Sequence, residues 1–415
     1  MRGRSFINKS SNVCPLALAG LIVLISVVSV HAQTIPNPDP PSNPGMRLGA
    51  VVLSPTIRLS EFGYDSNVLN LDDSARPVGD FVATLSPAVN AWFRFAHVRV
   101  SSHSQFDLYY YKTLPDLRAV DKDNAAQVDL LVNRMRLFVV GGLAEAQRRQ
   151  SLEIDAIAQR QNKTATLGAD VRLSGKTFLG VSVTRASLKY APNSLYLGTD
   201  LGTALNYKSS GETVGLRYAA TPLTTFAVTV SHNQTRFDNE TDRNSSDLTI
   251  IPSVEFSPFA LVSGRAAVGF IKRTFDNATT PFAGSTASVD LSYILLGRTR
   301  FTFAVNRRLE YSYLPGLNDY LVTGATVSVT QRLGDAWDLG GSFGPARLSY
   351  RQAIATSGQA ARLNPDETVV NSGLDLGYNV KRTRVGLYAE HIQRDSDGAR
   401  GFKRVRLGTT VKYEF

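Results

Sequence analysis

The sequence predicts an all-β fold, a transmembrane antiparallel up-and-down β-barrel, and three observations lead to this prediction. Apolar and polar residues alternate in segments of about 9–14 residues from position 47 to the end of the chain. The connections between these segments are short and long in turn. Aromatic residues gather beside the short connections. An apolar outer face, a polar inner face and an aromatic ring at one membrane boundary are typical of outer-membrane barrels.

The chain of 415 residues begins with a segment that predicts export. Arg2, Arg4 and Lys9 precede an apolar run at 15–29, and "VHA" at 30–32 has the small-x-small form of a cleavage site. The run is shorter than the roughly 20 residues that a spanning helix needs, so a retained anchor is only the alternative. We therefore expect residues 1–32 to be a signal peptide that is removed on export.

The single cysteine, Cys14, lies inside this expected signal peptide. Cleavage would leave a mature chain without disulfides or a thiol nucleophile. Residues 33–46, which contain "QTIPNPDPPSNPG", are rich in proline and read as an N-terminal periplasmic linker. The barrel is then expected to occupy residues 47–415.

Individual segments show the alternation clearly. "TFAVTVS" places Phe226, Val228 and Val230 on one face and small or polar residues on the other. The final segment, "VRLGTTVKYEF", alternates to the last residue, which is aromatic. A closed barrel explains this ending, because its last strand must pair with its first over its full length.

The connections predict the orientation and the number of strands. "SGKT" (174–177) and "TPLT" (221–224) are short, whereas "RFDNETDRNSS" (236–246) and "IATSGQAARLNPDET" (354–368) are long. In outer-membrane barrels short turns face the periplasm and long loops face outward. We count about 18 strands, with 16 as the alternative, and the region 124–208 hides a turn.

The carboxyl terminus also resembles the assembly signal of outer-membrane barrels. A polar residue, Arg406, is followed by Gly408, Val411, Tyr413 and the terminal Phe415. The resemblance implies that the barrel assembly machinery of the outer membrane is a partner, in addition to outer-membrane lipid.

Charged residues alternate onto the face that should line the pore. Two interpretations are open: charges of both signs pair across strands and stiffen the wall, or unpaired arginines create a weak anion preference. We place the strongest candidate for the second interpretation on the last two strands, at Arg384, Arg404 and Arg406. The expected pore-lining residues are Arg384, Arg404, Arg406, Arg308, Arg265, Asp290, Asp375 and Glu390.

No motif indicates catalysis. After cleavage His97, His103, His232 and His391 remain, and no two have the spacing of a metal-binding pair on one strand. The formal net charge is +10, but the cations are scattered singly, without the basic patch that nucleic-acid binding needs. We therefore expect no enzyme, no cofactor, no metal and no nucleic-acid partner.

The segment "LGAVVLSPTIRLSEFGYDSNV" (48–68), with the turn "TPLTTFAV" after "GLRYA", resembles the putative beta-barrel porin 2 family. Members are outer-membrane proteins of Gram-negative bacteria, and some are encoded with exopolysaccharide genes. The resemblance implies a barrel in the cell outer membrane and carries no catalytic residues.

Three functions follow from the predicted barrel. The first is a porin-like channel for passive diffusion of small hydrophilic solutes, because a barrel of this size leaves an aqueous lumen. The alternatives are an accessory barrel for exopolysaccharide export and a structural or adhesion barrel. A long loop folded into the lumen would favour the channel.

Overall fold

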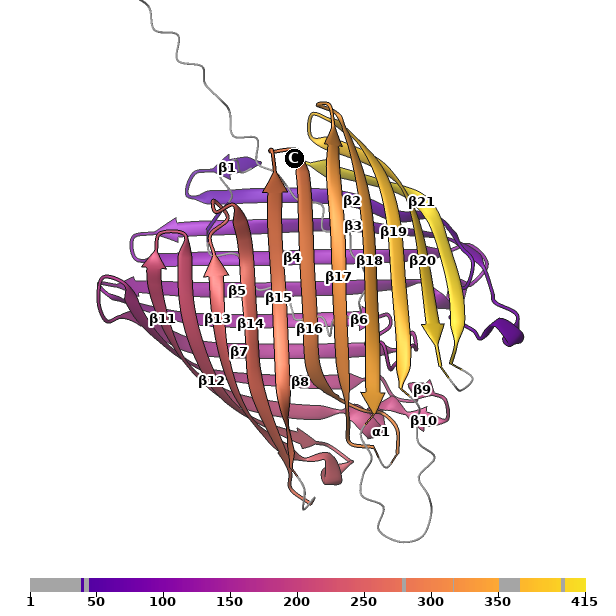
Figure 1. Ribbon diagram of the computed structural model, residues 1–415, viewed down its shortest axis with the longest axis horizontal. Coiled ribbons are helices and arrows are strands. Elements are labelled where there is room, and N and C mark those ends of the chain that lie inside the picture. The colour runs from indigo at the N-terminus through magenta and orange to yellow at the C-terminus, as the bar shows by residue number, and fades with distance from the viewer. Residues whose placement is uncertain (1–38, 41–44, 278–280, 316, 351–365, 397–399) are drawn as a thin grey trace, which may run out of the picture.

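The computed structural model describes residues 39–40, 45–277, 281–315, 317–350, 366–396 and 400–415. Eighteen antiparallel strands form a closed barrel in which each strand pairs with its neighbours along the chain (Figure 1). This confirms the prediction of 18 strands over the alternative of 16. The wall consists of β2 (Val51–Asp65), β3 (Asp80–Phe95), β4 (Val98–Tyr111), β5 (Ala119–Val132), β6 (Met135–Gln147), β7 (Gln159–Arg172), β8 (Thr177–Tyr190), β11 (Tyr207–Thr221), β12 (Thr224–Phe237), β13 (Ser245–Phe256), β14 (Val262–Phe275), β15 (Phe282–Leu295), β16 (Thr299–Tyr311), β17 (Asp319–Leu333), β18 (Trp337–Tyr350), β19 (Glu367–Val380), β20 (Thr383–Asp395) and β21 (Phe402–Glu414).

Small elements complete the fold at its two ends. β1 pairs with the start of β2 at the short-turn end. The connections at the other end carry a two-stranded ribbon and four short helical segments. These elements are β1 (Met46–Leu48), β9 (Leu195–Tyr196), β10 (Thr199–Asp200), α1 (Leu201–Leu205), η1 (Asp73–Ala75), η2 (Pro115–Leu117) and η3 (Thr241–Arg243).

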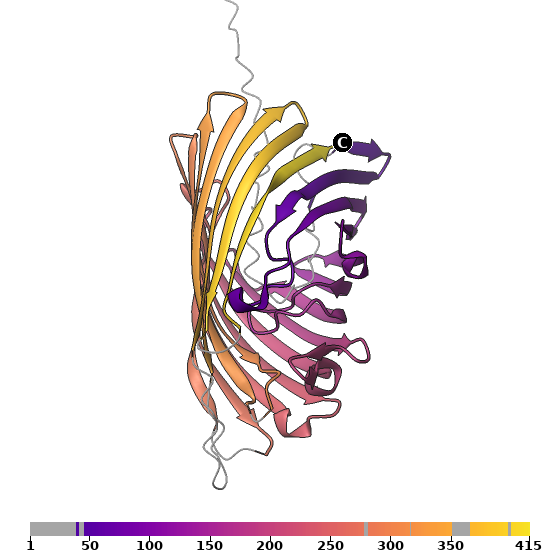
Figure 2. The ribbon, with the colours of Figure 1, turned by 90° about the vertical axis from the view of Figure 1, so that its right-hand side faces the viewer.

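The first and last wall strands close the barrel. β2 and β21 pair from Thr56↔Glu414 to Asp65↔Arg406, and Figure 2 shows the yellow last strand next to the indigo first strands. Phe415 extends the contact, since its N–H donates to the carbonyl of Pro55 at 3.3 Å. The pairing contains one β-bulge, at which Glu61 adopts a positive φ of 55°.

The two faces of the wall differ as the alternation predicts. Large apolar side chains are exposed on the outside, for example Val268, which is 58% exposed, and Leu167, which is 62% exposed. Small and polar residues point inward, as expected for a water-facing wall. Those in the middle of the wall include Gly180, Ser182, Gly215, Thr229, Ser288, Ser292, Thr302, Ser328, Ser342 and Gly373.

The turn that the sequence hides in region 124–208 lies between β5 and β6. Val132 pairs with Met135, so only Asn133 and Arg134 connect the strands. Asn133 has a positive φ of 51°, a conformation that asparagine adopts more readily than most residues. The short connection explains why the two strands look continuous in the sequence.

The aromatic ring is present at the short-turn end. Tyr293 and Phe301 stack across β15 and β16 with ring centroids 6.3 Å apart. Trp337 and Tyr378 make the equivalent contact at 4.8 Å. An aromatic ring of this kind is typical of a membrane boundary, and its expected place on the periplasmic side stays a prediction.

One seam of the wall is incomplete. β15 and β16 pair only from Leu295↔Thr299 to Ala287↔Arg307, so the strand pairing across this seam does not include residues 282–286 and 308–311. Arg307 still contacts Ser285 and Thr286 beyond the last pair. Figure 1 shows the two strands separating toward the long-loop end. The pairings of β15 with β14 and of β16 with β17 continue past this point.

The expected signal peptide lies outside the described residues. Of the expected linker, Asp39 lies at the short-turn end of the barrel, where Arg99 Nη1 is 3.3 Å from Asp39 Oδ1. Within the described ranges, no helix combines the length and the apolar character that a membrane crossing requires.

Candidate functional site: the lumen and its inward loop

The connection between β6 and β7, residues 148–158, folds into the barrel. Leu152 packs against Tyr320, Val322, Leu348 and Val369, which point inward from β17, β18 and β19. These strands lie on the far side of the barrel from β6 and β7. The loop, which we call the inward loop, therefore crosses the lumen.

Glu153 anchors the centre of the inward loop. Its side chain is 0% exposed and accepts hydrogen bonds from Ser312 Oγ at 2.5 Å and from the N–H of Tyr313 at 3.3 Å. Its backbone carbonyl accepts from the hydroxyl of Tyr196 and from Arg400. Burial raises the pKa of Glu153 to about 8, so the carboxyl is largely protonated at neutral pH.

A second polar anchor lies at Asp155. Its carboxylate accepts from Asn70 Nδ2 at 2.8 Å and forms an ion pair with Arg149. Asn70 in turn accepts from Arg404 Nη1 at 3.2 Å, which ties the inward loop to β21. The loop is thus held by residues from the β2–β3 and β16–β17 connections as well as by the wall.

An apolar cluster fills the space beside these anchors. Arg243 closes it from one side by donating to the carbonyls of Ala204 and Leu314, at 3.2 Å and 3.0 Å. The buried members come from the inward loop, β8, α1, β12 and the β16–β17 connection. They are Ile154, Ala158, Leu188, Tyr190, Leu201, Ala204, Leu205, Phe237 and Tyr313.

A cavity of about 300 Å³ lies between the inward loop and the unpaired end of β16. Tyr207, Tyr311 and Tyr320 line it together with aliphatic residues of the apolar cluster. Arg308 and Glu310 form an ion pair on its wall, and the hydroxyl of Tyr320 donates to Glu310 at 2.6 Å. The cavity is aromatic, and the charges on its wall are paired.

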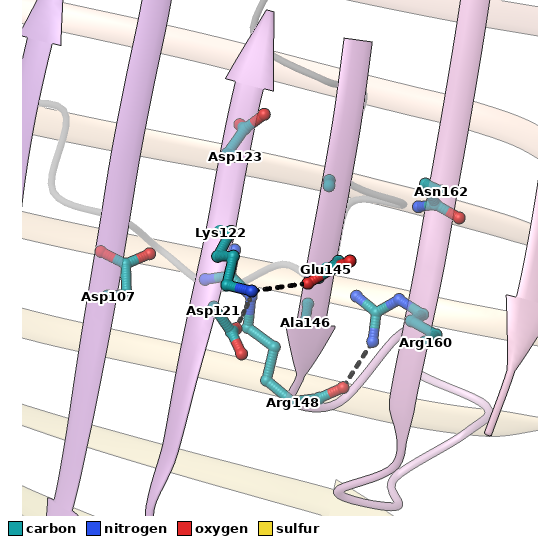
Figure 3. A pocket seen from close by; sticks show the side chains of 10 residues that line it. Asp107, Asp121, Lys122, Asp123, Glu145, Ala146, Arg148, Arg160 and Asn162 are labelled. Carbon is teal, nitrogen blue, oxygen red and sulfur yellow. Dashed lines mark hydrogen bonds and ion pairs between the residues drawn. The ribbon is translucent and has the colours of Figure 1, made fainter.

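The base of the inward loop rests on an acidic part of the wall (Figure 3). Asp121 accepts from the N–H of Gln147 at 2.6 Å, and Arg148 Nε lies 3.2 Å from the same carboxylate. Arg160 donates to the carbonyl of Arg148 at 2.6 Å. Asp107 and Asp123 lie beside them, so three carboxylates and two guanidinium groups meet where the inward loop leaves the wall.

The arginines of the last two strands are all in ion pairs. Arg384 contacts Asp338 and Asp375. Arg406 contacts Glu61 at 2.6 Å and Glu390 through its Nε at 2.7 Å. Arg404 Nε is 2.9 Å from the carboxylate of Asp65. The interpretation of these arginines as unpaired cations is wrong, because each faces a carboxylate on its own or a nearby strand.

The three arginines also do not form one cluster. Arg384 lies opposite Lys412 at the short-turn end, whereas Arg404 lies opposite Ile392. Eight residues of β20 separate these two positions, which is about 26 Å at the rise of a strand. This exceeds the screening length of roughly 8 Å at physiological salt, so Arg384 cannot act together with Arg404.

The other predicted pore-lining residues are spread over the wall. Arg308 is paired with Glu310 beside the cavity. Arg265 lies opposite both Glu255 and Asp290 in register and is 3.6 Å from Glu255. Their role in lining a conducting pore stays a prediction.

Sequence reasoning missed the inward loop. The signal was the presence of Leu152, Ile154 and Ile157 in a segment that should be a polar connection. Apolar residues in a long barrel loop indicate that the loop packs against something. The wall to which it docks comes from strands far away in the sequence, which periodicity cannot reveal.

The histidines are placed without a common site. His103 points inward and lies 2.8 Å from Asn90 Oδ1, whereas His232 and His391 are on outward positions. In the part of the chain that the structure describes, no three His, Cys, Asp or Glu residues are grouped to hold a metal ion.

The residues of the expected assembly signal lie on β21 and at its end. Gly408 faces inward under Tyr388, and a Cβ at this glycine would lie 2.9 Å from the tyrosine ring. Tyr413 and Phe415 pack edge to face at 4.7 Å in the aromatic ring. Recognition by an assembly machinery stays a prediction.

The closed 18-stranded wall, its apolar outer face and its polar lumen define an outer-membrane β-barrel of the porin type. The model of the family described as putative beta-barrel porin 2 matches residues 39–415. The chain belongs to this family, as its first strand and its turns predict.

Several solved structures are similar to this chain at low sequence identity. A BenF-like porin from Pseudomonas fluorescens Pf-5 is 12% identical with a TM-score of 0.51, and the alignment covers 89% of this chain and 99% of that one. OpdL from Pseudomonas aeruginosa is 12% identical with a TM-score of 0.47 and coverage of 89% and 99%. The FrpB iron transporter from Neisseria meningitidis is 10% identical with a TM-score of 0.44, and the alignment covers 82% of this chain but only 62% of the transporter. No curated protein matches the chain.

Proposed function

We propose that this barrel is a channel for passive diffusion of small hydrophilic solutes. The observation that carries the proposal is the inward loop, which narrows a lumen whose wall carries many Gly, Ser and Thr residues between its paired charges. Small polar side chains leave room for water, and a loop held across the lumen sets the size of what passes. Barrels of 16–18 strands are wide enough to need such a constriction if they are to select by size.

The charges of the wall support weak rather than strong ion selectivity. The arginines of β20 and β21 are neutralised by carboxylates, and the acidic residues at the base of the inward loop lie beside Arg148 and Arg160. Paired charges stiffen the wall and present little net field to a passing ion. The constriction therefore acts mainly through its size.

The proposal includes the route to the membrane. The chain would be exported with a cleaved signal peptide at residues 1–32 and inserted into the outer membrane by the barrel assembly machinery. The family match and the barrel fold support the destination, and the sequence supports the route.

Conductance of the purified protein in planar bilayers tests the channel. We expect stable steps of conductance and swelling of liposomes by small sugars. Replacing Gln150–Asp155 with a short Gly-Ser linker should raise the conductance and admit larger sugars. The same replacement at Pro115–Leu117, which lies on the rim outside the lumen, is the control and should leave both unchanged.

If neither the unmodified protein nor the loop-replaced variant conducts ions in folded samples, the channel proposal is refuted. The accessory role in exopolysaccharide export and the structural or adhesion role would then be the remaining candidates. Binding of polysaccharide to the folded barrel would separate these two.

A further inference from the structure

Four cations surround Ser187 on the outer face of the barrel. Lys163 on β7 and Lys208 on β11 lie directly opposite Ser187 in register, one on each side. Arg185 and Lys189 lie two positions away along β8, one on each side, and therefore on the same face. Strand geometry puts the flanking positions about 5 Å away across the strands and about 7 Å away along β8.

The cations sit at the boundary of the lipid-facing band. Toward the short turns, the outer face of β8 continues past Arg185 with Val183 and Val181. On the neighbouring strands Leu167 follows Ala165 on β7, and Val214 follows Ser210 and Glu212 on β11; the two valines of β8, Leu167 and Val214 are all exposed. Exposed apolar residues on this face contact lipid tails. The group around Ser187 lies beyond them toward the long loops, at the level of the headgroups of the outer leaflet.

These cations lack the partners that others at this end have. On the same outer face Lys122 is paired with Glu145 at 3.0 Å and Arg236 with Asp276 at 3.5 Å. Among the described residues, Lys163, Arg185 and Lys189 have no ion pair.

The fourth cation is only weakly paired, since Lys208 reaches Asp238 at 3.9 Å. The nearest carboxylates lie at the edge of the group, on Glu145, Glu212 and Asp238. Three exposed cations without an ion pair around one hydroxyl make a positive site that faces the membrane.

We propose that Lys163, Arg185, Lys189 and Lys208 bind a phosphate group of an outer-leaflet glycolipid above Ser187. The hydroxyl of Ser187 would donate to the same phosphate that the cations surround. A lipid is the occupant that fits, because the site is continuous with the apolar band and faces away from the lumen. Near a membrane surface each such cation adds about 1 kcal/mol, roughly a fivefold gain in affinity.

Binding of purified bisphosphorylated lipid A to the detergent-solubilised barrel, measured by native mass spectrometry, tests the site. The variant K163Q/R185Q/K189Q should lose about a hundredfold in affinity, the product of three fivefold steps. The control variant K122Q/R236Q/R347Q removes three cations that are already paired, so it should stay within a few-fold of the unmodified protein. Fully dephosphorylated lipid A should bind all three proteins equally weakly.

A second variant guards against misfolding. Ser187→Asp places a negative charge among the four cations at the level of the headgroups, keeps all four cations and should still abolish binding. Equal loss in the two triple variants, or equal binding of phosphorylated and dephosphorylated lipid, would overturn the proposal. Binding of millimolar inorganic phosphate to this site, without any binding of lipid A, would overturn the assignment to a lipid. Single-channel conductance should be unchanged in every variant, so this outcome is independent of the proposed function.

Discussion

Val268→Arg tests which face of the wall meets lipid. Val268 is 58% exposed on the outer face of β14, with six residues of the strand on one side and seven on the other. It therefore lies near the middle of the membrane, where an arginine costs roughly 2–4 kcal/mol in such barrels. We expect this loss in the free energy of unfolding, a change of about 30- to 700-fold in the equilibrium constant.

Thr302→Arg is the matched control for the opposite face. Thr302 points into the lumen between Ser292 and Ser328, where an arginine keeps its water. Its cost should stay below about 1 kcal/mol. Urea titrations in lipid vesicles, followed by tryptophan fluorescence, measure both values. A larger loss for Thr302→Arg than for Val268→Arg would mean that the register of these strands is displaced by one residue.

Three further predictions concern the chain end, the ion pairs and the inward loop. Phe415→Asp should lower the amount of barrel in the outer membrane of cells more than it lowers refolding in detergent; normal membrane levels would contradict the assembly-signal hypothesis. Arg406→Gln should lower the free energy of unfolding by about 3 kcal/mol in a urea titration, because Glu61 and Glu390 lose their shared cation. Changing both carboxylates to glutamine as well should restore the stability, and no such recovery would count against the ion pair. The pKa of Glu153 is raised by burial to about 8, so the docked loop should lose stability as pH rises from about 4.5 to 8 and change little above that. Fluctuations of the channel current should therefore grow over this window and become independent of pH in Glu153→Gln, and a variant that keeps the dependence would refute the assignment.

Alternation predicts the wall well because a strand has only two faces. A one-residue error would move every apolar side chain into water, so the sequence specifies the facing of residues such as Val228 and Leu387 strongly. The bulge at Glu61 could also have been predicted from the sequence pattern. Ile57 is on an odd position of the outer face and Phe62 on an even one, and only an extra residue between them allows both to point outward.

The interior could not be predicted in the same way. Glu153 is defined by contacts with Ser312 and Arg400, which are remote in sequence and lie in connections without periodicity. The separation of Arg384 from Arg404 follows from antiparallel order, since one lies beside a short turn and the other beside a long loop. Counting residues from each connection would have revealed this distance along the wall, whereas knowing only that both arginines face inward did not.

The closing seam between β2 and β21 has a consequence for folding kinetics. Every other pair of wall strands is formed by consecutive strands, whereas Asp65 and Arg406 meet across nearly the whole chain. Chain entropy makes this closure about 3 kcal/mol more costly than forming a hairpin. The seam should therefore be the last to form, and a half-built barrel exposes two free edges until then.

The ion pairs across this seam attract the free edges of β2 and β21 to each other during closure. Arg404 meets Asp65 and Arg406 meets Glu61, so the positive charges of the last strand match the negative charges of the first. A shift of two residues in the pairing would leave one charge of each sign without its partner, in a wall that otherwise has little to distinguish one register from the next. The charges that face the lumen thus favour one alignment of the last strand on the first, and closure in this register removes the two edges that β2 and β21 would otherwise offer to another chain.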